Sequence, residues 1–165
     1  MQAVIMAAGK STRTYPLTLT KPKPLLKVAN KPILEHTLDN LNGIVDEAIL
    51  IVGYKKNLIK KHFGNKYKSL KIKYAEQKQQ LGTAHALSVA ERHIKDRFLL
   101  MAGDDIYSKG YINAFIRHRY SILTAKTNKP QNFGVIVQKN GILANFIEKP
   151  KKFISNLINT SLYCL

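Results

Sequence analysis

Apolar positions fall into two alternating patterns along the first part of the chain. Short runs that are apolar throughout, or at every second position, predict strands at residues 3–6, 48–52, 70–74 and 98–102. Between these runs, apolar residues recur at helical spacing and predict helices near residues 32–42, 57–63 and 83–94. Because strand and helix alternate, we expect an α/β fold, with a mostly parallel sheet and helices on both faces.

The first predicted helix also carries signals for its two ends. Asn30 is expected to cap its N-terminus, Pro32 suits its first turn, and Gly43 should end it. Its apolar face is formed by Ile33, Leu34, Thr37, Leu38 and Leu41.

The pattern changes after residue 120, where strands follow one another without helices between them. These strands are expected at residues 121–125, 133–138, 142–147 and 158–165, as a small β extension of the sheet. Asn140 and Gly141 predict a tight hairpin, because both positions must tolerate a positive φ. The last strand is expected to lack neighbours and to leave apolar surface uncovered, which would favour self-association.

A long cationic loop, residues 7–29, follows the first strand. Pro16, Pro22 and Pro24 exclude a regular helix from it. Its small residues let backbone N–H groups approach phosphate oxygens, which Arg13 and Lys23 can neutralise. The loop therefore predicts a binding site for a chain of phosphates.

One motif in this loop is misleading. Residues 9–12 (GKST) look like the end of a Walker A loop, but Val4 stands where that motif requires its first glycine. A P-loop is therefore excluded.

Composition narrows the class of protein further. The 165 residues suffice for one domain, 45 % of them are hydrophobic, and no apolar run reaches membrane-spanning length. The single Cys164 excludes an internal disulfide and favours a reducing compartment, so a cytoplasmic protein that binds no membrane is expected.

The formal net charge is +17, and residues 55–73 hold eight lysines and no acidic residue. Such a run is a feature that would indicate a nucleic-acid-binding module, but a solvated surface explains it more simply. Specific nucleic-acid binding is not expected, whereas the charge should attract anionic sugar phosphates and nucleotides.

Several blocks in a fixed order resemble the sugar-phosphate nucleotidylyltransferases, enzymes that join a nucleoside triphosphate to a sugar 1-phosphate. The blocks are residues 7–13 (AAGKSTR), 22–24 (PKP), 31–34 (KPIL), 77–86 (QKQQLGTAHA), 103–104 (GD), 132–134 (NFG), 148–150 (EKP) and 159–160 (NT). Ser11 and Ser161 stand where that family usually has glycine. The resemblance implies a Rossmann-like fold of the nucleotide-diphospho-sugar transferase type.

The resemblance also implies roles for individual residues. Lys23 would contact the α-phosphate, Arg13 the β- and γ-phosphates, and Asp104 a Mg²⁺ ion. Nucleotide contacts are expected from Ala7, Ala8, Gly9, Lys10, Arg13, Lys23, Gln77, Gly82 and Thr83, and sugar contacts from Gly134, Glu148, Lys149 and Asn159.

Within these roles, Gln77 has both an acceptor and a donor and can read the imide edge of uracil or thymine. Asp105 should face away from Asp104, because neighbours on an extended chain point in opposite directions. His85 is interpreted as a packing or capping residue, since the attacking sugar phosphate is already an anion and needs no base.

The implied reaction is one in-line displacement, in which the phosphate of N-acetylglucosamine 1-phosphate or glucose 1-phosphate attacks the α-phosphorus of UTP or dTTP. An inactive nucleotide-binding fragment and a basic nucleic-acid-binding module remain alternatives. Residues 1–165 are expected to form a single nucleotidylyltransferase domain. We expect this domain to be truncated, because the resembling family carries a second metal-binding aspartate further along the chain. A homo-oligomer is a possible assembly of the domain. Such a chain should bind nucleotide but turn over very slowly.

Overall fold

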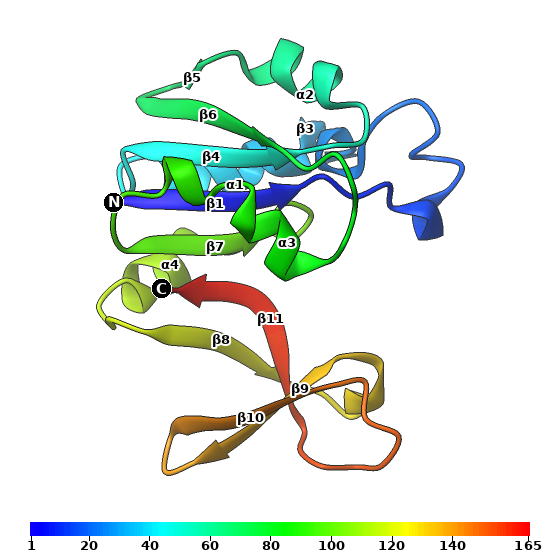
Figure 1. The fold of residues 1–165 in the computed structure, drawn as a ribbon, viewed down its shortest axis with the longest axis vertical. Coiled ribbons are helices and arrows are strands. Elements are labelled where there is room, and N and C mark those ends of the chain that lie inside the picture. Colours follow the sequence, from blue (N-terminus) through cyan, green and yellow to red (C-terminus); the bar gives the residue numbers. More distant parts are fainter.

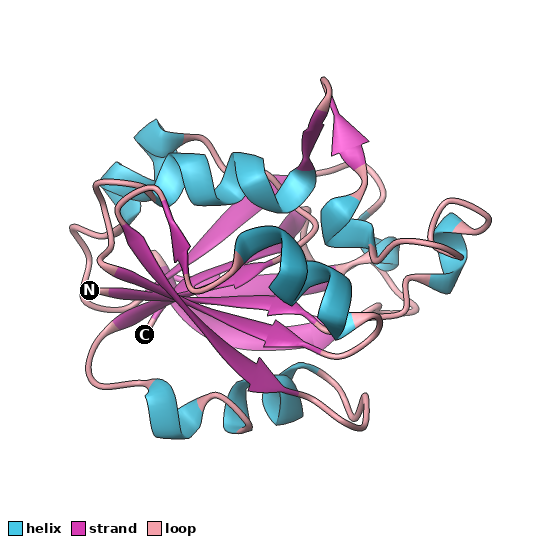
Figure 2. Cartoon of the chain, turned by 90° about the horizontal axis from the view of Figure 1, so that it is seen from above, coloured by secondary structure: helices cyan, strands magenta, loops and turns pink.

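The computed structural model describes residues 1–165 as one mixed sheet with helices on both faces (Figures 1 and 2). The sheet order is β10-β9-β11-β7-β1-β4-β6-β5, with β8 paired to β11. Strands β7, β1, β4 and β6 run parallel. The predicted α/β fold with a small β extension is therefore confirmed.

The strands of the parallel part are those that the apolar runs predict. They are β1 (Gln2–Ala7), β4 (Glu47–Val52), β6 (Leu70–Glu76) and β7 (Phe98–Ala102), and the short β5 (Lys66–Tyr67) adds an antiparallel edge. Nearly every residue of β1 and all of β4 are buried, as expected for strands covered on both faces.

Helices cover the two faces unequally. On one face α1 (Ile33–Leu41), α2 (Lys56–Phe63) and α4 (Lys109–Phe115) bury side chains such as Leu38, Ile59 and Ile112 in the larger core. The other face is covered by α3 (Thr83–Ser88) and the turn after it, through Ala86 and Ala90.

The β extension is built from β8 (Ser121–Lys126), β9 (Gly134–Lys139), β10 (Ile142–Glu148) and β11 (Leu157–Cys164). It forms the lower lobe of Figure 1, where β9 and β10 make the predicted hairpin through Asn140 (φ 52°) and Gly141 (φ 76°). Strand β11 leaves this lobe and runs antiparallel beside β7.

The expectation of an uncovered last strand was wrong. Strand β11 pairs with β7, β8 and β9, and its side chains Leu162 and Cys164 are fully buried. Within the β extension, the most exposed apolar side chains lie instead on the hairpin and the loop after it, at Ile142 (72 %) and Phe153 (76 %). Although β11 is the last strand of the sequence, it therefore has neighbouring strands in the sheet.

Three further details differ from the predictions. Asn30 does not cap α1, because Ala29 and Asn30 both have positive φ and form the turn between β2 (Lys27–Val28) and β3 (Lys31–Pro32). Helix α3 ends at Ser88, since the next hydrogen bonds tighten to a three-residue spacing at Ala90. Helix α4 was not predicted. No helix of the protein combines the length and the apolar character needed to cross a membrane.

Candidate functional site

The carboxyl ends of β1 and β7 lie side by side and form the base of the candidate site. Gly103, just after β7, donates its backbone N–H to Met6 O at 2.9 Å. A Cβ at Gly103 would lie 2.6 Å from that same oxygen, so the approach requires glycine. Ligands of parallel α/β sheets bind at such strand ends.

Lys23 and Asp104 meet at this edge. Lys23 lies in a short 3₁₀ turn, Lys23–Leu25, and its Nζ donates to Asp104 Oδ2 at 2.6 Å. Both side chains are partly exposed, at 29 % and 40 %. Two residues that are far apart in the sequence thus form one charged pair that a ligand can reach.

The loop after β1, residues 8–18 and called the glycine loop from here on, is anchored by its own side chains. Ser11 adopts a left-handed conformation (φ 51°), and its carbonyl oxygen accepts from Thr14 Oγ1 at 2.7 Å and from the buried Thr18 Oγ1 at 3.0 Å. Tyr54 Oη donates to Thr18 O at 3.0 Å. The left-handed φ explains why glycine is the more usual residue at position 11.

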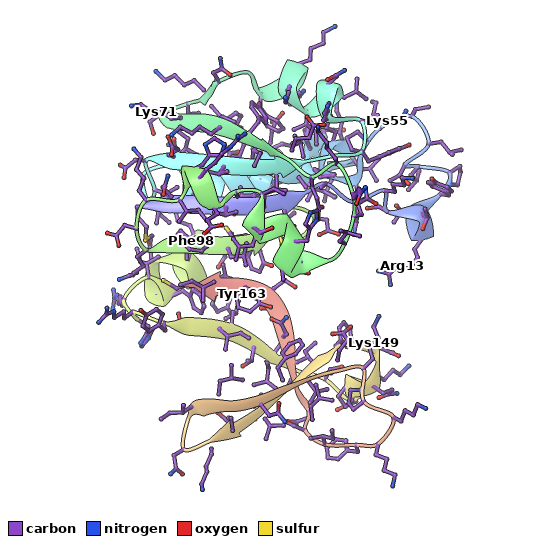
Figure 3. All side chains as sticks on the ribbon, in the orientation of Figure 1. Arg13, Lys55, Lys71, Phe98, Lys149 and Tyr163 are labelled. Carbon is purple, nitrogen blue, oxygen red and sulfur yellow. The ribbon has the colours of Figure 1, made fainter.

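This anchoring leaves a row of backbone donors unused. The backbone N–H groups of residues 9–13 donate no hydrogen bond within the chain. Successive free N–H groups in a turn with a left-handed residue attract anions. Arg13 extends from the same loop, exposed and without an ion pair, and Figure 3 shows it on the part of the loop that projects beyond the strand ends. The structure does not bring Arg13 to Lys23 and Asp104.

Gln77 lies at the end of β6, beside the loop. The strand end approaches β1 through Gly53, where a Cβ would lie 2.9 Å from both Ala8 O and Gln77 O. Gln77 is buried (5 % exposed), and its Nε2 donates to Gly82 O at 3.2 Å and lies 3.1 Å from His85 Nδ1. His85 therefore contacts Gln77, and the interpretation of His85 as a packing or capping residue missed this contact.

Two residues at the site were not predicted. Gln80 Nε2 donates to Ala8 O at 3.0 Å, and the backbone N–H of Tyr54 donates to the same oxygen at 3.1 Å. Together they tie the segment around Gln77 to the glycine loop. Glutamine and tyrosine are common on protein surfaces. The repeated glutamines of residues 77–80 were therefore the only feature of the sequence that pointed to these contacts.

The predicted sugar residues gather on the β extension. Gly134 pairs with Glu148 across the β9–β10 ladder, and a Cβ at Gly134 would lie 3.1 Å from Glu148 Oε2. The backbone N–H of Lys149 donates to Phe133 O at 3.0 Å. In Figure 3, Lys149 lies on the same side of the molecule as Arg13, the side at which β1 ends.

Asn159 on β11 is held by its neighbours. Its Oδ1 accepts from the backbone N–H of Ser161 at 2.9 Å, and its Nδ2 donates to Tyr163 Oη at 2.6 Å. Ser161 has a φ of 59°, within the irregularity between Asn159 and Tyr163. Both serines that stand where the resembling family usually has glycine therefore have left-handed backbones, a conformation that glycine adopts without strain.

The carboxylates next to the site differ in their surroundings. The two neighbouring carboxylates have different partners: Asp105 Oδ2 lies 3.4 Å from Tyr107 Oη, whereas Asp104 Oδ2 accepts from Lys23 Nζ. Desolvation and the neighbouring Asp104 charge raise the pKa of the Asp105 carboxyl. No group of three or more His, Cys, Asp or Glu side chains is arranged to hold a metal ion. One reachable carboxylate, that of Asp104, fits the protein's share of a Mg²⁺ site, because this ion keeps most of its positions for water and phosphate.

The mostly parallel sheet and the helices on both of its faces define an α/β protein with a Rossmann-like fold. The family model for nucleotidyl transferases matches residues 2–165, and the chain belongs to that family.

Relatives and a solved structure agree with this assignment. The chain is 40 % identical to the bifunctional protein GlmU of Methanococcus maripaludis, over all of this chain and 40 % of the relative. It is 38 % identical to the UTP–glucose-1-phosphate uridylyltransferase AglF of Haloferax volcanii, over 99 % of this chain and 71 % of the relative. A Bacillus anthracis structure assigned as a glucose-1-phosphate thymidylyltransferase superposes with a TM-score of 0.88 at 26 % identity, covering 99 % of this chain and 71 % of the other. The chain thus spans about 40 % of the length of the GlmU relatives that it matches.

Proposed function

We propose that this chain binds UTP or dTTP and transfers the nucleotidyl group to a sugar 1-phosphate, with release of pyrophosphate. The observation that carries the proposal is the 2.6 Å contact between Lys23 Nζ and Asp104 Oδ2. This contact joins a cation and a carboxylate near the carboxyl ends of β1 and β7, and the loop that leaves β1 holds backbone N–H groups of residues 9–13 that have no acceptor in the chain. A triphosphate is the ligand that uses all three features.

Each group has a distinct task in the proposed displacement. A phosphate oxygen of the sugar 1-phosphate attacks the α-phosphorus, and the bond from that phosphorus to the pyrophosphate oxygen breaks. Lys23 would stabilise the charge that develops on the α-phosphate, and the free N–H groups would position the phosphate chain. Mg²⁺ bound at Asp104 would supply further positive charge against the phosphate oxygens. Arg13, an exposed cation of the same loop, would contact the β- and γ-phosphates.

The base and the sugar are assigned from the surroundings of Gln77 and of the β extension. Gln77 offers an amide beside Gly82, a pairing suited to the imide edge of uracil or thymine. Names of relatives agree, since one is a uridylyltransferase and another is assigned as a thymidylyltransferase, both for glucose 1-phosphate. Glu148 and Asn159 would hydrogen-bond sugar hydroxyls beside Gly134, and Lys149 would face the sugar's phosphate. N-acetylglucosamine 1-phosphate and glucose 1-phosphate are the proposed acceptors.

Nucleotide binding tests the proposal directly. In the presence of Mg²⁺, UTP or dTTP should raise the melting temperature of the 165-residue chain more than CTP, ATP or GTP, by linkage of binding to stability. Equal shifts from all of these nucleotides would contradict the role of Gln77. Pyrophosphate release over a panel of sugar 1-phosphates then identifies the acceptor.

A further inference from the structure

The amide of Gln77 has only one orientation that satisfies its neighbours. A carbonyl oxygen can only accept, so Gly82 O, at 3.2 Å, identifies the nearby Gln77 atom as the nitrogen. The same NH₂ group lies 3.1 Å from His85 Nδ1. Because that nitrogen must accept the second N–H, it carries no proton, and His85 is the neutral tautomer protonated on Nε2.

This orientation leaves the Gln77 carbonyl oxygen free. Oε1 accepts no hydrogen bond in the chain, and it is not among the side-chain atoms that are both buried and unpartnered, Arg97 Nε and Ser121 Oγ. The backbone N–H of Gly82 is free as well. Gln77 and Gly82, which are in contact through the amide nitrogen of Gln77 and the carbonyl oxygen of Gly82, therefore offer one free acceptor and one free donor.

That pair matches one pyrimidine edge and opposes the other. Uracil and thymine present the N3–H donor next to the O4 acceptor, whereas cytosine presents the N3 acceptor next to the N4 amino donor. If the Gln77 amide turned over, its NH₂ group would face the base and could donate to N3 of cytosine, so that only the Gly82 N–H would still oppose cytosine. The orientation of this amide thus contributes to the separation of UTP from CTP, which have the same charge.

We propose that His85 is a positioning residue, whose unprotonated Nδ1 holds the Gln77 amide with Oε1 toward the nucleobase and so favours UTP and dTTP over CTP. This inference rests on the proposed function, in which Gln77 reads the base. His85 is placed beside Gln77 by α3, which begins directly after Gly82 (φ 95°). His85 forms no ion pair.

The test is the ratio of the UTP and CTP dissociation constants, measured by calorimetry with Mg²⁺ on the 165-residue chain. His85→Leu removes the acceptor and should lower the preference for UTP about threefold to tenfold, the range of one neutral hydrogen bond. His85→Asn places an amide oxygen near the position of Nδ1 and should retain the preference. Ser88→Ala alters the same helix without touching Gln77 and should also retain it.

Each outcome separates the inference from the proposed function. If the wild-type chain bound UTP and CTP with equal dissociation constants, recognition of the base by Gln77 would be wrong, and so would the role of His85. A clear wild-type preference that His85→Leu leaves unchanged, or equal weakening of both nucleotides, would overturn the role of His85 alone. NMR of the imidazole nitrogens in the wild-type chain tests the same point without a substitution. There, a proton on Nδ1 of His85 at neutral pH would contradict the inference.

Discussion

Lys23 and Asp104 neutralise each other in the structure, yet the proposed chemistry needs both to face phosphate and metal. The pair is partly exposed, and such pairs contribute at most about 1 kcal/mol to stability. A triphosphate carries several negative charges and can therefore draw Lys23 away at little cost. The ion pair keeps the two side chains at the strand ends while no ligand is bound, without locking them together.

Removal of Lys23 is the sharpest test at the level of one residue. Lys23→Ala should lower turnover by at least roughly a hundredfold, the typical cost of losing one donor at developing charge. The melting temperature should change little, because only a partly exposed ion pair is lost. Pyrophosphate release and thermal unfolding measure the two effects.

Lys21→Ala is the matched control for this substitution. Lys21 lies two residues earlier in the same proline-rich loop, is exposed, and forms no ion pair. Its removal should leave turnover within a few-fold of the wild-type value. If Lys23→Ala behaved like Lys21→Ala, Lys23 would be an ordinary surface lysine and the proposed mechanism would be wrong.

At the scale of elements, the site depends on how closely β1 and β7 approach at their carboxyl ends. A Cβ at Gly103 would meet Met6 O at 2.6 Å and Ala7 Cβ at 3.1 Å. Gly103→Ala should therefore destabilise the protein by about 1–3 kcal/mol, the usual cost of overpacking. Because Asp104 follows directly, nucleotide-dependent activity should fall as well. Urea unfolding and pyrophosphate release provide the measurements.

Gly110→Ala makes the same chemical change where there is space. A Cβ at Gly110 meets nothing within 4 Å, and the residue lies inside α4. Alanine is the better helix former, so this variant should gain up to about 1 kcal/mol of stability. Equal stabilities of the two variants would contradict the claim that Gly103 marks a close approach of two strands.

Asp39 on α1 joins three elements on the same side of the sheet. Its carboxylate accepts from Lys31 at 2.6 Å and from Tyr67 Oη at 3.0 Å, and Lys68 lies 2.5 Å away. Burial by itself would raise the pKa of Asp39, but the hydrogen bonds from Lys31, Lys68 and Tyr67 outweigh it and lower the pKa to about 2. The ionised carboxylate therefore ties α1 to β3 and β5.

A lowered folded-state pKa gives stability that is present above the unfolded-state pKa and is lost as pH falls through the folded-state value. Asp39 should accordingly contribute on the order of 1–2 kcal/mol at neutral pH, lost between about pH 4 and pH 2. Asp39→Asn should lower stability at pH 7 and flatten its decline in that window, measured by urea unfolding. Asp96→Asn, at an exposed aspartate outside any ion pair, serves as control; an unaltered acid decline in Asp39→Asn would refute the assignment.

The elements also show what the sequence could and could not predict. Strands β1, β4 and β7 were predictable because both of their faces are covered, which makes each run apolar throughout. Helix α4 was missed because only Ile112 and Phe115 of its residues are buried, too few to establish a period. The position of β11 beside β7 depends on pairing between distant residues, and no local pattern contains that information.

The candidate site likewise has a part that the sequence could predict and a part that it could not. Lys23 and Asp104 could be placed together because one follows β1, the other follows β7, and parallel strands end at one edge. The contact between Gln77 and His85 could not be predicted, because it depends on the turn at Gly82 that brings α3 back over the strand end. Side-chain orientation within a site follows from such turns, whose shape a motif does not specify.

At the scale of the whole molecule, the net charge of +17 is distributed over the surface and is not concentrated in one patch. Figure 3 shows Lys55 and Lys71, both from the lysine-rich run of residues 55–73, at opposite ends of the sheet. Three lysines of the run form ion pairs, namely Lys56, Lys68 and Lys73.

Lysines also contact the tyrosine rings near this run, through the pairs Lys55–Tyr54, Lys60–Tyr74 and Lys68–Tyr67. Single-stranded nucleic acids bind grooves in which aromatic rings are free for stacking, and these rings are not free.

We therefore expect nucleic-acid binding to be weak, independent of sequence and strongly reduced by salt, because counterion release alone would drive it. Binding of UTP should persist at about 0.2 M salt, since it rests on positioned contacts as well as on charge. Replacing Lys60, Lys61, Lys66 and Lys71 with glutamine should weaken oligonucleotide binding for every sequence, reduce its salt dependence and leave the UTP affinity nearly unchanged. Fluorescence anisotropy of labelled oligonucleotides over a salt series, beside calorimetry with UTP, measures both. A sequence-selective complex that survives high salt would show that the lysine-rich surface is a nucleic-acid site, and that the nucleotide site does not account for the charge of the molecule.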